Sequence, residues 1–121
     1  MDEKIEKAFV VANYMATLSN QKRIILEEYN QKLIYYFNGA TFKITPTLIN
    51  FAKTLIDQEF SQDAVLIDDN NFPVIIPDLK KFLDEIIFAY FEATNEYAKK
   101  YNDIRTKRKI LDIVDLWQMA L

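Results

Sequence analysis

The sequence contains no cysteine and no histidine. The absence of cysteine excludes disulfides, thiolate nucleophiles, iron–sulfur clusters and thiolate zinc sites. Without histidine, the chain lacks the side chain most used for acid–base chemistry near neutral pH. Its serines, Ser19 and Ser61, do not lie in the glycine-flanked turn that exposes a hydrolase nucleophile. We therefore expect a protein that is not an enzyme, and we predict no cofactor and no metal.

Glycine and proline are also scarce, with one glycine and three prolines among 121 residues. A single glycine excludes a glycine-rich phosphate-binding loop, and so few turn residues indicate long regular elements. Half of the residues are hydrophobic and 14% are aromatic, which is enough to form a core. We predict a single domain over residues 1–121.

The net charge of −3 and the isoelectric point near 5.0 argue against a protein that wraps nucleic acid or anionic membrane. Apolar runs are shorter than the roughly 18 residues that a membrane helix needs. The N-terminal residues 1–4 are charged and no cleavable apolar segment follows them. We therefore expect a cytoplasmic protein.

The N-terminal quarter of the chain, residues 3–32, has a helical pattern without glycine or proline. Its apolar stripe, with Lys22 in the one polar position, consists of Ala8, Val11, Met15, Leu18, Ile25 and Tyr29. This three- and four-residue spacing is typical of helix pairs. The pair Ser19 and Asn20 could break the segment, so one helix or two shorter helices are both open.

Two hairpins and a short helix are predicted for the middle of the chain. Asn38-Gly39 lies between the aromatic and β-branched runs 33–37 and 40–44, which is the strongest short-range signal for a hairpin. Thr45-Pro46 then begins a helix that should end near Gln58. The extended runs 64–67 and 72–76 flank a polar turn, and Pro73 places the second run at a sheet edge or just before a strand begins.

A last long helix begins after Pro77, with Asp78 as its N-cap. Its predicted apolar stripe contains Leu79, Phe82, Leu83, Ile86, Ile87, Tyr90, Ala93, Tyr97, Tyr101 and Ile104. A basic run over residues 105–109 and a short amphipathic tail over residues 110–121 follow. The element order α–ββ–α–ββ–α predicts a helix-dominated α+β fold with two long terminal helices packed as an antiparallel pair, and the hairpins could join in one sheet.

Two central segments could carry a binding site, although each has an ordinary structural explanation. The turn Asp68-Asp69-Asn70-Asn71 offers oxygen ligands for a hard cation, and a carboxylate-based hydrolase with a metal at Asp68 and Asp69 is one hypothesis. The turn lacks the glycine and distal glutamate of an EF-hand, so a plain turn is favoured. The aromatic hairpin of Tyr35, Tyr36, Phe37 and Phe42 could stack bases, but packing in the core is the favoured interpretation.

The basic cluster consists of Arg105, Lys107, Arg108 and Lys109. It could bind phosphates or an acidic partner. Alternatively, it is the cationic last turn that offsets the helix dipole and ends the long helix.

The tail is apolar on more than one face, and a helix of this kind must bury itself on its own domain or on another chain. Its candidate partner-binding residues are Ile113, Leu116, Trp117 and Leu121. Tryptophan is enriched at binding hot spots. Docking within the chain and contact between subunits are both open.

Taken whole, the chain resembles the uncharacterised small proteins carried by contractile-tailed phages of marine cyanobacteria. The stretches that carry the resemblance are residues 12–21, 35–42, 66–71 and 105–109. The resemblance implies a virus-encoded accessory or assembly protein that acts in the cytoplasm of an infected bacterium. It implies no activity and no functional residue.

The leading hypothesis is a non-enzymatic module for protein–protein interaction or assembly, a homo-oligomer that associates through its long helices and its tail. The second is a nucleic-acid-associated regulator that uses the basic cluster at residues 105–109. Steep loss of binding with added salt would favour the second hypothesis, and self-association that resists salt would favour the first.

Overall fold

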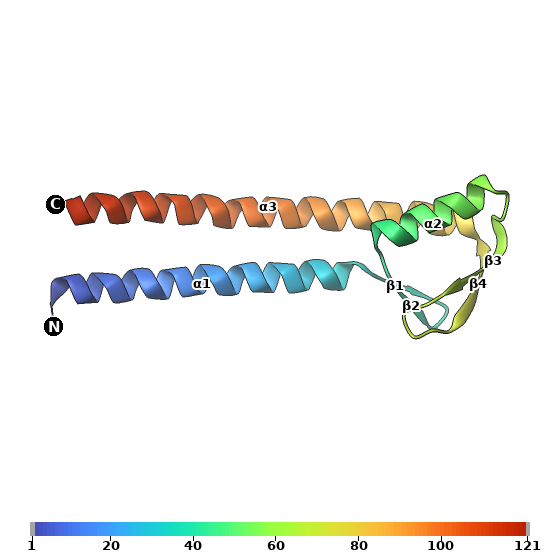
Figure 1. Ribbon diagram of the computed structural model, residues 1–121, viewed down its shortest axis with the longest axis horizontal. Coiled ribbons are helices and arrows are strands. Elements are labelled where there is room, and N and C mark those ends of the chain that lie inside the picture. Colours follow the sequence, from blue (N-terminus) through green and yellow to red (C-terminus); the bar gives the residue numbers. More distant parts are fainter. Residues whose placement is uncertain (1, 121) are drawn as a thin grey trace. The chain divides into compact units, whose positions relative to one another are not determined.

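A computed structural model describes the backbone of residues 2–120 and the side chains of residues 2–107. The elements, in chain order (Figure 1), are α1 (Glu3–Lys32), β1 (Ile34–Phe37), β2 (Ala40–Lys43), α2 (Pro46–Asp57), β3 (Gln62–Ile67), β4 (Pro73–Asp78) and α3 (Leu79–Ala120). This order confirms the predicted helix-dominated α+β class. Of the two alternatives left open for residues 3–32, the structure contains the single helix, because α1 continues through Ser19 and Asn20.

The chain divides into two compact units. The central unit is Tyr29–Asn95, and the helical unit combines Met1–Glu28 with Glu96–Leu121. Helices α1 and α3 contribute residues to both units. The prediction of a single domain rests on chain length and composition, and it stays a prediction.

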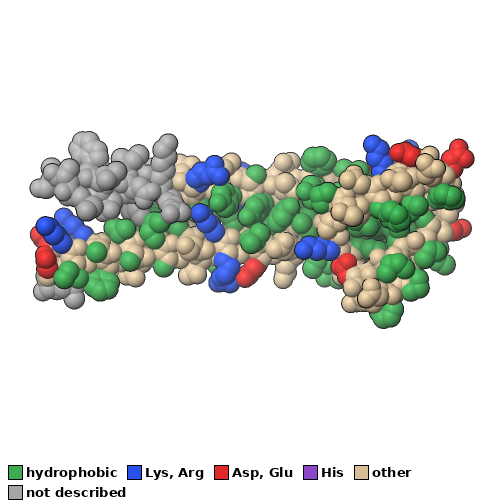
Figure 2. All heavy atoms as spheres, in the orientation of Figure 1, with side chains coloured by type: hydrophobic (Ala, Val, Ile, Leu, Met, Phe, Trp, Pro, Cys, Tyr) green, Lys and Arg blue, Asp and Glu red, His purple; other side chains and the backbone are tan. Residues whose placement is uncertain are grey.

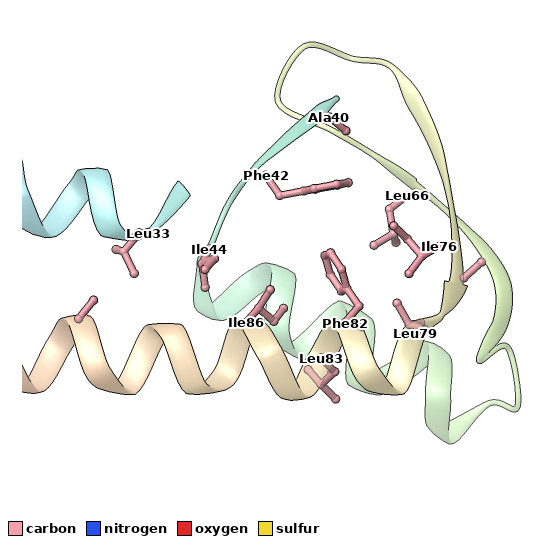
Figure 3. Close-up of a cluster of buried hydrophobic side chains, with 13 residues drawn as sticks. Leu33, Ala40, Phe42, Ile44, Leu66, Ile76, Leu79, Phe82, Leu83 and Ile86 are labelled. Atoms are coloured by element: carbon pink, nitrogen blue, oxygen red, sulfur yellow. The ribbon is translucent and has the colours of Figure 1, made fainter. Parts of the chain in front are cut away.

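The core of the central unit surrounds Phe82 of α3, which is 2% exposed. The Phe82 ring makes edge contacts with Tyr35, Phe37 and Phe42, with ring centroids 5.3, 6.3 and 5.4 Å away. In Figure 3 the side chains of Phe42 and Phe82 point toward one another between the hairpins and the helix. These three hairpin aromatics therefore pack in the core, as favoured above, whereas Tyr36 is exposed.

The first hairpin has the predicted turn. Asn38 and Gly39 both have positive φ, at 46° and 80°, and Phe37 pairs with Ala40 across the turn. Positive φ at both positions is typical of the type I′ turn, whose twist matches that of the strands.

The second hairpin pairs β3 with β4, and β4 begins at Pro73 opposite Ile67. In the described part of the chain, the hairpins form two separate two-stranded sheets, so the suggestion of one joint sheet is wrong. The backbone hydrogen bond between them, from Asp69 N–H to the Thr41 carbonyl at 2.9 Å, lies in the turn beyond the end of β3, so it does not continue a ladder.

Side chains cap the two helices of the central unit as their sequences predict. Thr45 Oγ1 accepts a hydrogen bond from the Leu48 N–H at 3.1 Å, directly before Pro46 begins α2. Asp78 accepts from the Lys81 N–H at 3.2 Å at the start of α3. Each cap satisfies an N–H that would otherwise have no partner in the first turn of the helix.

The helical unit contains the predicted stripe of α1 up to Ile25, and Tyr29, which is half-buried, belongs to the central unit. Leu18 is buried, and Val11, Met15 and Ile25 are half-buried, whereas Ala8 is exposed and its prediction is wrong. The apolar stripe of α3 is buried or half-buried at every predicted position, from Leu79 to Ile104.

Helix α3 does not end at the basic cluster but runs on to Ala120. The interpretation of this cluster as a cationic last turn is therefore wrong, and the tail is not a separate helix. The physical reason lies in the sequence, because residues 79–120 contain neither glycine nor proline to stop the helix.

Candidate functional site

Within the helical unit, α1 and α3 lie antiparallel and side by side (Figure 1). Leu18 and Ile104 are 3% and 6% exposed, which places them in its interior. Two cations lie over the ring of Tyr101, with Lys22 Nζ at 5.2 Å and the Arg105 guanidinium at 5.4 Å from the centroid. Aromatic rings attract such cations, and contacts of this kind at exposed sites stabilise by about 0.5–1 kcal/mol.

Ion pairs occupy one border of this helix pair. Lys100 Nζ lies 2.9 Å from Glu96 and 3.0 Å from Glu28, and these two carboxylates, Glu96 first, raise the pKa of Lys100. Because these side chains are partly exposed, such pairs contribute little to stability. They make this border of the helix pair polar. An apolar contact with another molecule is therefore expected on other faces of the helices.

A second apolar surface lies on the N-terminal half of α1, outside the stripe that faces the interior. We call it the α1 apolar face; it consists of Ile5, Phe9, Val10 and Tyr14, which are 48%, 59%, 68% and 37% exposed. Ile5 and Phe9, like Val10 and Tyr14, are four residues apart and therefore adjacent on a helix. A helix that is apolar on several sides is normally covered by other elements. Figure 2 shows hydrophobic side chains exposed along α1.

The structure places part of the predicted basic cluster. Arg105 and Lys107 are exposed on α3, and the helical backbone continues through Arg108 and Lys109. The side chains of Arg108 and Lys109 lie outside the described residues, as do those of the predicted partner-binding residues Ile113, Leu116, Trp117 and Leu121. The roles assigned to all of these residues stay predictions.

Another apolar surface, on the second hairpin, was missed by the sequence analysis. We call it the outer hairpin face; it consists of Val65, Ile67, Pro73 and Ile75, all of which are exposed. The signal was present, because positions 64–67 are all apolar. A strand with one solvated face normally alternates apolar and polar residues, so a continuous apolar run indicates that both faces are to be covered.

The acidic turn between β3 and β4 has a structural role. The Asp68 carboxylate accepts hydrogen bonds from three backbone N–H groups, those of Phe72 at 2.8 Å, Asn70 at 2.9 Å and Thr41 at 3.3 Å. Burial opposes ionisation of Asp68, but the three hydrogen bonds outweigh it and lower its pKa. These bonds hold the turn against β2 and use the carboxylate oxygens that the metal hypothesis required. In the described part of the chain, no three acidic residues are grouped so that they could hold a metal.

An open pocket of about 450 Å³ lies beside this turn. Its walls come from the turn of the first hairpin and the start of β4, and its lining residues are Asn38, Gly39, Ala40, Asp68, Phe72, Pro73, Val74 and Ile75. The pocket is mainly apolar, and its one carboxylate is that of Asp68, which is already hydrogen-bonded to backbone. It therefore offers an apolar side chain a place to dock and presents no general acid or base.

A second perturbed group lies in the core of the central unit. Tyr35 donates a hydrogen bond to Glu85, and burial together with this neighbouring carboxylate raises the pKa of Tyr35 to about 12. Both effects favour the neutral phenol. The neutral phenol and its hydrogen bond to Glu85 thus link β1 to α3.

Comparison of the chain with protein-family models, curated proteins and solved structures finds no match. Over the residues that the structure describes, none of the helices contains a segment that is long and apolar enough to cross a membrane. The candidate sites are therefore identified from exposed side chains. They are the α1 apolar face and the outer hairpin face.

Proposed function

We propose that this protein is a non-enzymatic assembly module that forms homo-oligomers through its long helices. The observation that carries the proposal is the α1 apolar face, because Phe9 and Val10 expose more than half of their area in a helix whose opposite side already packs in the interior. Monomeric proteins rarely leave contiguous apolar patches of this kind in water. The sequence of the tail, with Trp117, is also rich in apolar residues.

The cellular role follows from the same proposal. A small assembly module without catalytic groups acts as a structural or accessory component. The resemblance to phage-encoded proteins would place such a component in the cytoplasm of an infected bacterium.

The experiment compares the mass of variants by light scattering after size exclusion. Phe9→Asp should lower the mass of the oligomer and leave the helical circular dichroism intact, because Phe9 is 59% exposed in the single chain. Burial of that exposed part contributes about 1.5 kcal/mol per copy. Because the substitution is present in both copies of a dimer, it should raise the dissociation constant roughly a hundredfold. Trp117→Ala should also lower the mass.

Phe51→Asp is the matched control, since Phe51 is 52% exposed but lies on α2 of the central unit. It should leave the mass unchanged. A Phe9→Asp protein with the mass of the wild type would show that the α1 apolar face makes no subunit contact.

A further inference from the structure

The outer hairpin face is apolar on both of its strands. Along β3, Ala64 and Leu66 point into the core, whereas Val65 and Ile67 are 56% and 60% exposed. Val65 pairs with Ile75 of β4, which is also 60% exposed. The exposed side chains thus form cross-strand apolar pairs, which are normally found where a second layer covers the sheet.

The edges of this hairpin are poorly suited to bind another strand. Asp68 donates its N–H to the Phe72 carbonyl, so the backbone groups of Phe72 face β3. The direction of the backbone N–H and C=O groups alternates from one residue to the next along a strand. The nitrogens of Pro73 and Pro77 therefore face the free edge of β4. Proline has no N–H to donate, which blocks strand addition there. On β3, Asp63 has a positive φ of 52°, which interrupts the extended backbone. A partner is therefore expected to contact the side chains of the outer face and not to extend the sheet.

Acidic residues lie at both ends of the exposed side of β3. Asp63 precedes Val65 and Ile67 in the sequence and Asp69 follows them in the turn, and both aspartates are exposed. Among the described side chains, none forms an ion pair with either of them. A two-fold contact between two such faces would oppose aspartate to aspartate, which is unfavourable. A complementary partner must bring apolar side chains together with positive charge.

The chain itself contains one segment with this chemistry. The basic cluster at residues 105–109 is followed by apolar residues with the i, i+3, i+4, i+7 spacing of one helix face, namely Ile110, Ile113, Val114 and Trp117. A helix over residues 105–117 is ~18 Å long. The six residues of β3, Gln62–Ile67, span ~20 Å. The sequence of this segment thus resembles the outer hairpin face in length and apolar character, and its basic residues are opposite in charge to Asp63 and Asp69.

We propose that the outer hairpin face of one copy binds the basic C-terminal segment, residues 105–121, of a second copy. This inference rests on the proposed self-association and names a pair of surfaces for it. The contact joins two different surfaces, so each copy has one of each and can bind two neighbours. Contacts of this head-to-tail kind build rings or open filaments.

The first test is complementation between two variants, each defective in one surface. Ile67→Asp changes the face and Trp117→Asp changes the segment, and each variant alone should have a lower mass than the wild type. An equimolar mixture should form an additional species that neither variant forms alone, because one variant retains the face and the other retains the segment. A mixture that gives only the sum of the two separate profiles would overturn the inference.

Exchange of the charges is the second test. Asp63→Lys with Asp69→Lys should weaken association at least tenfold at low salt, and so should Lys107→Glu with Arg108→Glu. All four changes in one chain should restore the mass of the wild type, because attraction is restored with opposite signs. Phe51→Asp again serves as the control that should have no effect.

The outcomes separate this inference from the proposed function. If the wild type is a monomer at all concentrations, the proposed function fails. If the wild type self-associates but the face variants do not change its mass, only the head-to-tail contact is wrong. If the segment variants abolish binding of duplex DNA in a gel shift and leave the mass unchanged, the basic cluster binds nucleic acid and the inference is likewise overturned.

Discussion

The turn of the first hairpin allows a stability prediction from backbone geometry alone. Gly39 has a φ of +80°, and a Cβ atom added there would meet no atom within 4 Å. A Cβ at this position therefore creates no clash, and the cost that we consider is that of holding an L-residue in the left-handed region. That cost is about 1–2 kcal/mol. A substitution also lowers the conformational entropy of the unfolded chain, which stabilises the fold. At positions whose φ and ψ suit the new residue, this gain is ~0.4–1 kcal/mol, and we expect a comparable gain here.

These terms predict that Gly39→Ala lowers the free energy of unfolding by about 1 kcal/mol and that Gly39→Val lowers it by more than about 1 kcal/mol, because a β-branched side chain is more restricted. Gly39→Asn should cost less than either, since asparagine tolerates this region. Urea denaturation followed by circular dichroism at one protein concentration measures all of these differences. Equal stability of the valine variant and the wild type would refute the argument, and an equal loss for all three variants would show that backbone conformation is not the cause.

Other predictions concern the core and the two perturbed groups. Phe82→Ala should lower the free energy of unfolding by about 3–5 kcal/mol, because it leaves a cavity among three aromatic rings, and a smaller loss in urea denaturation would mean that the core collapses around it. Asp68 has a lowered pKa in the folded chain, so the stability that it contributes is present above pH ~4 and is lost as the pH falls further. Asp68→Asn should lower the melting temperature at pH 7 and flatten this acid dependence, and an unchanged pH profile would contradict the hydrogen-bonding argument. In an ultraviolet titration, a late phase near pH 12 should disappear in Tyr35→Phe, and its persistence would assign that phase to another tyrosine.

Local signals in the sequence predict most of the fold. The Asn38-Gly39 turn, the cap by Thr45 and the stripe from Leu79 to Ile104 each depend on residues close in the chain, and the structure contains all three. The error at Ala8 has a different origin. Periodicity identifies the face on which a residue lies, but it does not show how far along the helix that face stays covered.

The end of α3 and the separation of the sheets depend on different physics. A run of basic residues is compatible with the end of a helix and with its interior, and the absence of any glycine or proline after Pro77 was the better guide. Whether two hairpins share a ladder depends on how their turns meet in space. Here Asp68 and Asp69 bond to Thr41 at the turn, and no local pattern encodes that contact.

The candidate surfaces were predicted only in part. The tail and basic cluster stand out in the sequence because their charge and apolar residues are concentrated in short runs. The outer hairpin face does not stand out, since an apolar strand such as 64–67 has the same sequence whether it is covered within the chain or by another molecule. The exposure of Val65 and Ile67 distinguishes the two cases.

The most direct test of the proposed function is the mass of the wild-type protein in solution. Light scattering after size exclusion should be measured over a hundredfold range of concentration, at low and high salt, with and without duplex DNA. We predict a defined oligomer whose mass exceeds the 14.3 kDa of one chain and which persists in high salt, because apolar burial is not screened. A monomer under all these conditions, or a change of mass only with DNA at low salt, would contradict the assignment as a self-assembling module.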